Sequence, residues 1–214
     1  MKTVQISNFL LLIFSLQIAY GQSPGYHSAM QKAIEKVMQG EEEIDFREAA
    51  NTFDRINQKE PEQWLPLYYG AYANVMLQAN LGDNTEKDRL LDLAKEKIDQ
   101  AQLISQNNSE LLAMQGFITM LRIPIDPATR GPQLSGSAMA VMQQAISLNP
   151  ENPRAHMFLA DMKFGMAQFF GNDNSEGCVS LKKALSLYES FQPQAELDPN
   201  WGKEWAQRRE SQCQ

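Results

Sequence analysis

The sequence contains few residues of the kinds that usually build catalytic and metal sites. Cysteine and histidine occur only twice each in 214 residues. Cys178, Cys213, His27 and His156 show no ligand spacing such as C-x-x-C or H-x-x-x-H. Neither histidine stands beside a nucleophile or acid in a recognisable catalytic arrangement, and there is no glycine-rich phosphate loop. The sequence therefore predicts no metal, no cofactor and no catalytic residue.

Basic residues are outnumbered and dispersed along the chain. There are 19 Lys and Arg residues against 26 Asp and Glu residues, which gives a formal net charge of −7. Nucleic acids and anionic membranes are bound through dense positive patches, and no such patch is visible. We therefore expect no nucleic-acid partner.

Long apolar runs are missing except near the N-terminus. Lys2 precedes an apolar stretch over residues 9–18, and small residues lead up to Gly21. This is the layout of a secretory signal peptide, and the stretch is shorter than the roughly 20 residues that span a bilayer as a helix. No cysteine stands at the cleavage point, so no lipid anchor is expected. We predict a signal peptide over residues 1–21 and a periplasmic or secreted mature domain over residues 22–214.

A pattern with a period of about 45 residues runs through the mature chain. Small residues that start amphipathic helices recur at Ala49, Ala94, Ala138 and Ala184. A large apolar residue follows each of them, at Phe53, Ile98, Met142 and Tyr188. A second small residue lies further on, at Ala71, Gly116, Ala160 and Ala206. No alternating strand pattern of useful length is present, so the pattern predicts an all-α chain of antiparallel helix pairs.

These columns resemble the tetratricopeptide repeat, and the segment AISLNPENPRAHMFLADM over residues 145–162 carries the resemblance best. The match covers roughly residues 43–206 and implies an α-solenoid of four helix pairs after an initial helix. An exported chain of this composition also looks like uncharacterised repeat proteins of the Bacteroidota envelope. The family's usual repeat has about 34 residues, whereas the period here is about 45. The surplus lies in the turn between the two helices of each pair. It makes either longer helices or a rim of loops, the longest over residues 123–136.

The resemblance also implies a binding surface, because the first helix of each pair lines the concave face in that family. Carried over position by position, the groove residues are Tyr68, Tyr72, Val75, Ala113, Phe117, Met120, Met157, Asp161 and Phe164. This surface is rich in rings and thioethers, which suit apolar or aromatic side chains of a partner peptide. Family members that grip a C-terminal carboxylate use Lys and Asn here. None of the nine residues is either type, so that activity is not implied.

Two interpretations of this aromatic stripe remain open. It either faces an open groove or belongs to the core, where the helix over residues 26–39 or the C-terminal helix around Trp201 and Trp205 would fill the groove. The favoured function is a non-enzymatic scaffold or adaptor for a protein or peptide. The first alternative is a binder of a small apolar ligand or lipid between helix pairs, and the second is an enzyme on a helical array. An enclosed apolar cavity would favour the small ligand, and an open groove the peptide.

Export also bears on the two cysteines, because exported proteins meet oxidising conditions. Cys178 opens one helix of the last pair, and Cys213 ends a terminal helix expected to run back antiparallel to it. Their sulfur atoms could then come within bonding distance. We predict a disulfide between them, with two unpaired thiols as the alternative.

Overall fold

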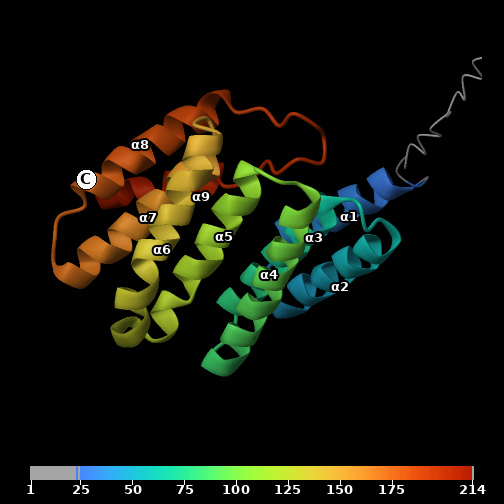
Figure 1. Ribbon diagram of the computed structural model, residues 1–214, viewed down its shortest axis with the longest axis horizontal. Helices are drawn as coiled ribbons and strands as arrows, with labels where there is room; N and C mark the ends of the chain where they lie inside the picture. Colours follow the sequence, from blue (N-terminus) through green and yellow to red (C-terminus); the bar gives the residue numbers. More distant parts are fainter. Residues whose placement is uncertain (1–22, 24, 214) are drawn as a thin grey trace, which may run out of the picture.

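The computed structural model describes residues 23 and 25–213 (Figure 1). The predicted signal peptide and its cleavage point at Gly21 lie outside the described residues, so both stay predictions. All regular structure in the described part of the chain is helical. The α-helices are α1 (Tyr26–Gln39), α2 (Glu43–Lys59), α3 (Trp64–Ala79), α4 (Asn84–Ile104), α5 (Ser109–Leu121), α6 (Pro127–Leu148), α7 (Pro153–Phe170), α8 (Ser175–Ser190) and α9 (Lys203–Arg208). Two short 3-10 helices are η1 (Ile123–Ile125) and η2 (Arg209–Cys213).

The helices form antiparallel pairs that stack side by side (Figure 1). Helices α3, α5 and α7 contact one another and form an inner layer, while α4, α6 and α8 pack against them as an outer layer. Helices α1 and α2 add to the α3 end of the stack. The predicted all-α solenoid of the tetratricopeptide kind is therefore confirmed. None of the described helices has the length and apolar character needed to cross a membrane.

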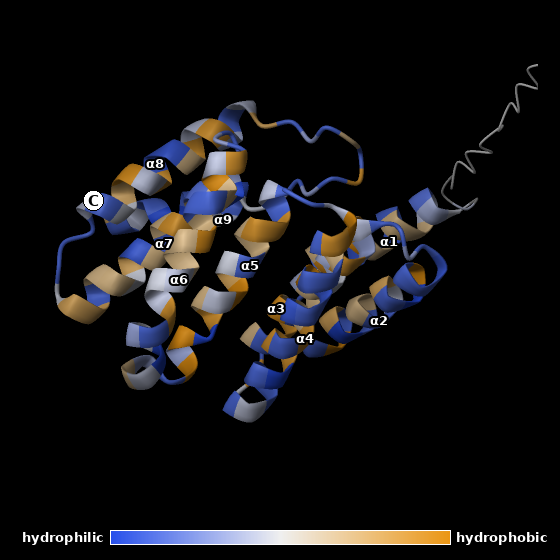
Figure 2. Ribbon diagram, viewed as in Figure 1, coloured by the Kyte–Doolittle hydropathy of each residue, from blue (hydrophilic) through white to orange (hydrophobic). Residues whose placement is uncertain are grey.

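Burial follows the two layers. Helix α3 is buried continuously from Pro66 to Val75, because it has neighbours on several sides. Helices α2 and α4 instead alternate between hydrophilic and hydrophobic residues, as Figure 2 shows. Their buried residues recur every three or four positions, which is typical of a helix with one solvated face. The core thus lies between the layers and continues along the whole stack.

The repeat columns correspond to the packing of the pairs. The first column is fully buried in every unit, at Ala49, Ala94, Ala138 and Ala184. The large apolar column is buried as well, at Phe53, Ile98, Met142 and Tyr188. The final unit departs from the others, because the helix that carries its second small residue, Ala206 in α9, has only six residues and follows a stretch without regular helix over residues 191–202. The lengthened repeat therefore holds for three units, and the fourth ends in an irregular segment.

The surplus residues of each repeat mostly lengthen helices. Helices α4 and α6 have 21 and 22 residues, and they begin where the side chains of Asp83 and Asp126 accept hydrogen bonds from backbone N–H groups of the first turn. Most of the segment 123–136 is helical, since η1 covers Ile123–Ile125 and α6 begins at Pro127 and continues through Pro132. The alternative of a loop rim at residues 123–136 is therefore wrong.

Small residues occur where the two helices of a pair approach most closely, and Gly116 shows how tight that approach is. A Cβ atom at this position would lie 2.8 Å from Cγ of Met142 and 3.4 Å from the carbonyl oxygen of Ala138, both in α6. Either the side chain of Met142 or the helix spacing would have to change to accommodate it. The glycine therefore sets the distance between α5 and α6.

We expect Gly116→Ala to lower the free energy of unfolding by about 1 to 2 kcal/mol, because the overpacking outweighs the better helix propensity of alanine. The matched control is Gly165→Ala in α7, where a Cβ atom would meet nothing within 4 Å. There the propensity acts alone, and stability should rise by up to about 1 kcal/mol. Urea denaturation of both variants measures this. A Gly116→Ala variant as stable as the control variant would contradict the tight approach.

Candidate functional site

The predicted groove residues lie together on the inner layer, formed by α3, α5 and α7. All of them are buried except Met120, which is half-buried. Their exposed fractions are 1% for Tyr68, 8% for Tyr72, 0% for Val75, 1% for Ala113, 1% for Phe117, 0% for Met157, 8% for Asp161 and 6% for Phe164. We call the side of α3, α5 and α7 that these residues share the inner face. It is not open to solvent in this conformation.

Residues 191–213, which we call the C-terminal segment, cover the inner face. The ring of Trp201 lies 4.5 Å from that of Tyr72 and 6.0 Å from that of Phe158, measured between ring centroids. The ring of Trp205 lies 5.3 Å from that of Phe117, which itself stacks on Phe158 at 4.2 Å. The aromatic stripe is therefore packed against the chain's own C-terminal tryptophans, as the core interpretation described.

A buried ion pair connects α5 with α7 below the C-terminal segment. Nε and Nη2 of Arg154 each donate a hydrogen bond of 2.7 Å to the carboxylate of Glu110. Arg154 is 1% exposed. Burial alone would lower the pKa of this guanidinium, but the adjacent Glu110 carboxylate outweighs it and raises the pKa above its ordinary value. The arginine therefore stays charged, and the two-point hydrogen bonding fixes its orientation.

Backbone carbonyl groups of the C-terminal segment are held by side chains of the repeats. Nη1 of Arg154 donates to the carbonyl oxygen of Trp201 at 3.0 Å, and the hydroxyl group of Tyr188 donates to the same oxygen at 3.3 Å. The hydroxyl group of Tyr69 donates to the carbonyl oxygen of Leu197 at 3.0 Å. These bonds satisfy carbonyl groups of a stretch that contains no regular helix.

One carboxylate of the inner face is less well satisfied. Nε of Arg209 lies 2.8 Å from Oδ1 of Asp161, but Oδ2 of Asp161 has no hydrogen bond of good geometry among the described residues. Burial raises the pKa of Asp161 to about 6, although Arg209 and Trp205 act to lower it. Both of the groups that lower this pKa belong to the C-terminal segment, and burial outweighs them.

A disulfide joins Cys178, in the first turn of α8, to Cys213 in η2. The C-terminal segment therefore leaves α8 at its last residue and is tied back to the start of the same helix. Cys213 is exposed, and Cys178 is half-buried. The bond joins the two cysteines that the sequence analysis paired.

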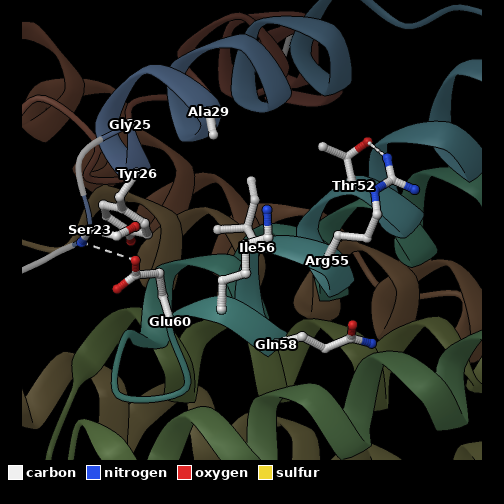
Figure 3. A pocket seen from close by; sticks show the side chains of 10 residues that line it. Ser23, Gly25, Tyr26, Ala29, Thr52, Arg55, Ile56, Gln58 and Glu60 are labelled. Atoms are coloured by element: carbon white, nitrogen blue, oxygen red, sulfur yellow. Dashed lines mark hydrogen bonds between the residues drawn. The ribbon is translucent and has the colours of Figure 1, made fainter.

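Two further hollows lie outside the inner face. The larger, about 690 Å³, lies at the end of the stack between the turns before α5 and α7 and the stretch 190–199. The smaller, about 470 Å³, lies between α1 and α2, where the backbone N–H of Ser23 donates to Glu60 (Figure 3). The buried hydroxyl group of Tyr26 has no hydrogen-bond partner there among the residues that the structure describes. Most of the polar lining of this hollow, including Arg55 and Gln58, is exposed. Neither hollow is an enclosed apolar cavity.

The two histidines lie apart from each other and from the inner face. His27 pairs with Glu196 on the surface, and Nε2 of His156 lies 3.0 Å from the carbonyl oxygen of Pro150. Neither histidine is part of the inner face. Among the described residues, no three His, Cys, Asp or Glu side chains come close enough together to hold a metal ion.

Glu110 and Arg154 are not among the residues predicted from the sequence, although the sequence contains a signal for them. The two residues are 44 positions apart, which is the repeat length, so they occupy equivalent positions in neighbouring units. Opposite charges in one repeat column come close together wherever the units stack. Comparing the columns for charge as well as for size would have predicted this pair.

The fold and the site define a helical-repeat protein of the tetratricopeptide kind whose C-terminal segment packs on its own inner face. No family model matches the chain, and no curated protein matches it. Among solved structures, it is similar to the HusA haemophore from Porphyromonas gingivalis, with a TM-score of 0.76 and 23% sequence identity over 88% of this chain and 92% of that one. A tetratricopeptide protein from Thermus thermophilus, TTC0263, shares 16% identity over 88% of this chain and 98% of its own, with a TM-score of 0.44. The likeness to HusA shows a shared fold over nearly the whole length of both chains.

The raised pKa of Asp161 predicts a pH dependence of stability. The folded state binds a proton more tightly than the unfolded state, whose Asp residues titrate near 3.9, so stability from this group is present below pH 4 and is lost as pH rises through 6. From pH 4 to pH 7, wild type should lose roughly 2 to 3 kcal/mol relative to Asp161→Asn. Urea denaturation of both proteins at the two pH values measures the difference.

The control is Glu204→Gln, which removes one exposed carboxylate from α9. Wild type and this variant should keep a nearly constant stability difference over the same pH range. If Asp161→Asn behaved like the control, the carboxylate would not be destabilised by burial.

Proposed function

We propose that this chain is an exported, non-enzymatic binding protein, that the inner face is its binding surface, and that its ligand is haem or a related porphyrin. The observation that carries the proposal is the likeness to the HusA haemophore along nearly the whole of both chains. The bonded cysteines are consistent with an oxidising compartment, periplasmic or extracellular. The nine predicted groove residues are the proposed site.

The chemistry of the inner face suits such a ligand. A porphyrin is a flat aromatic ring system with carboxylates along one edge. Tyr72, Phe117 and Phe158 supply rings that can stack on its faces. Beside them, Nη1 of Arg154 donates to a carbonyl oxygen of the C-terminal segment. If that segment moves away, this N–H is free to donate to a ligand carboxylate, while Glu110 continues to hold the guanidinium.

Binding at this surface requires the C-terminal segment to move, because Trp201 and Trp205 occupy the aromatic stripe. The segment is well suited to separate from the repeats. Residues 191–202 contain no regular helix, and the contact buries the poorly satisfied carboxylate of Asp161. Segments of this kind open with less free energy than packed helix pairs do. The apparent affinity is then set by how often the face is open.

A protein or peptide partner is the second candidate, and one observation favours it. The inner face already holds a stretch of polypeptide by two tryptophan rings and by hydrogen bonds to its carbonyl groups. A partner segment with similarly spaced aromatic residues could occupy the same surface. This would make the protein a scaffold or adaptor, with the C-terminal segment acting as an internal competitor.

The test is a titration of the mature protein with haemin and with iron-free protoporphyrin, followed by porphyrin absorption and tryptophan quenching. We expect saturable binding of both, because both porphyrins present the same aromatic ring faces and carboxylates to the inner face. Phe117→Leu and Phe158→Leu, which keep an apolar side chain but remove a ring, should each weaken binding by about tenfold.

The matched control is Phe53→Leu. Phe53 is also fully buried, but it belongs to α2. Its ring stacks on Tyr69 and is not part of the inner face. This variant should lose stability without losing porphyrin affinity. An absence of saturable binding would refute the proposed ligand. An equal loss of affinity in all three variants would refute the proposed site.

A further inference from the structure

The C-terminal segment is a loop closed by a covalent bond. It leaves α8 after Ser190, crosses the inner face and returns to Cys178 near the start of α8. The bond closes a ring with a sequence separation of 35 residues. The whole covering segment therefore lies between two attachment points on one helix.

The noncovalent contacts of this segment fall between its two attachment points. Leu197 and Trp201 are held by their carbonyl groups, and Trp205 packs against Phe117. Arg209 pairs with the poorly satisfied Asp161, and the carbonyl oxygen of Gln212 accepts a hydrogen bond of 3.0 Å from Nδ2 of Asn174. Beyond it, the disulfide fixes the end of the chain. Without that bond, the segment would be held at Ser190, by inner-face contacts that compete with a ligand, and by two exposed contacts, of Glu196 with His27 and of Gln212 with Asn174.

We propose that the Cys178–Cys213 disulfide is a redox-controlled latch that keeps the C-terminal segment over the inner face, and that its reduction opens the binding surface. This rests on the proposed function only in taking the inner face as the ligand site. The bond restricts the conformations available to the open segment, so breaking it favours the open state. Since the ligand binds only when the face is open, reduction should tighten binding.

The chemistry needs an external dithiol as reductant. Its thiolate attacks the exposed sulfur of Cys213, and Cys178 leaves as a thiolate. The second thiol of the reductant then attacks the mixed disulfide. The products are the oxidised, disulfide form of the reductant and two protein thiols, so two electrons and two protons pass to the protein.

The test compares three forms of the mature protein: oxidised wild type, wild type reduced with dithiothreitol, and the Cys178→Ser/Cys213→Ser double variant. The probe is iron-free protoporphyrin, because thiols would bind the iron of haemin. We expect the reduced and double-variant forms to bind it about tenfold more tightly than the oxidised form. Reductant should change nothing in the double variant, which controls for its direct effects.

A second readout does not depend on the ligand. Limited proteolysis should cut residues 191–202 faster in the reduced and double-variant forms, while helical circular dichroism shows that the repeats stay folded. If the double variant does not fold, the single variant Cys213→Ser at the exposed position replaces it.

The outcomes separate the two proposals. Faster cleavage without porphyrin binding in any form would support the latch and refute the proposed ligand. Equal porphyrin affinity and equal cleavage in all forms would overturn the latch and leave the proposed function standing.

Discussion

The arrangement of the inner face depends on the buried ion pair between Arg154 and Glu110. A guanidinium that is 1% exposed is tolerated only when its charge and its N–H groups are satisfied. Glu110 satisfies two of these groups and thereby ties α5 to α7. The remaining terminal nitrogen donates to the carbonyl oxygen of Trp201, so the position of the C-terminal segment follows from the same residue. The guanidinium also lies over the ring of Phe191, 4.7 Å from its centroid, where the segment begins.

The repeats and the C-terminal segment are held by different kinds of interaction. The repeats are held by columns of fully buried small and large residues that continue from one unit to the next. The C-terminal segment is held by tryptophan rings, by single carbonyl groups and by a disulfide at its far end. It also supplies Arg209, which pairs with the buried carboxylate of Asp161. A ligand with aromatic faces and a carboxylate would replace most of these contacts, which is why the covering segment and the ligand are expected to compete.

Most of the fold could be predicted from the sequence, because the repeat columns at Ala49, Ala94, Ala138 and Ala184 depend only on helix packing, which recurs in every unit. The site was harder to predict. Periodicity shows that Tyr72 and Phe117 share a face with other aromatic residues, but an apolar face has the same pattern whether it meets solvent, a partner or the chain's own end. What covers it depends on the irregular residues 191–202, which have no periodicity to read. The length of α6 was also hard to predict, since Pro132 favours a break and the helix nevertheless continues through it.

The central claim is that the C-terminal segment is a separable cover on an otherwise continuous stack of helices. Hydrogen exchange of the oxidised protein, followed by mass spectrometry at neutral pH, tests this most directly. Amides of α9 and η2 should exchange through a local opening of lower free energy than amides of α5 and α7, which should open only on global unfolding. If α9 and η2 were protected to the same extent as α5 and α7, the segment would be an integral part of the core and the account would be wrong.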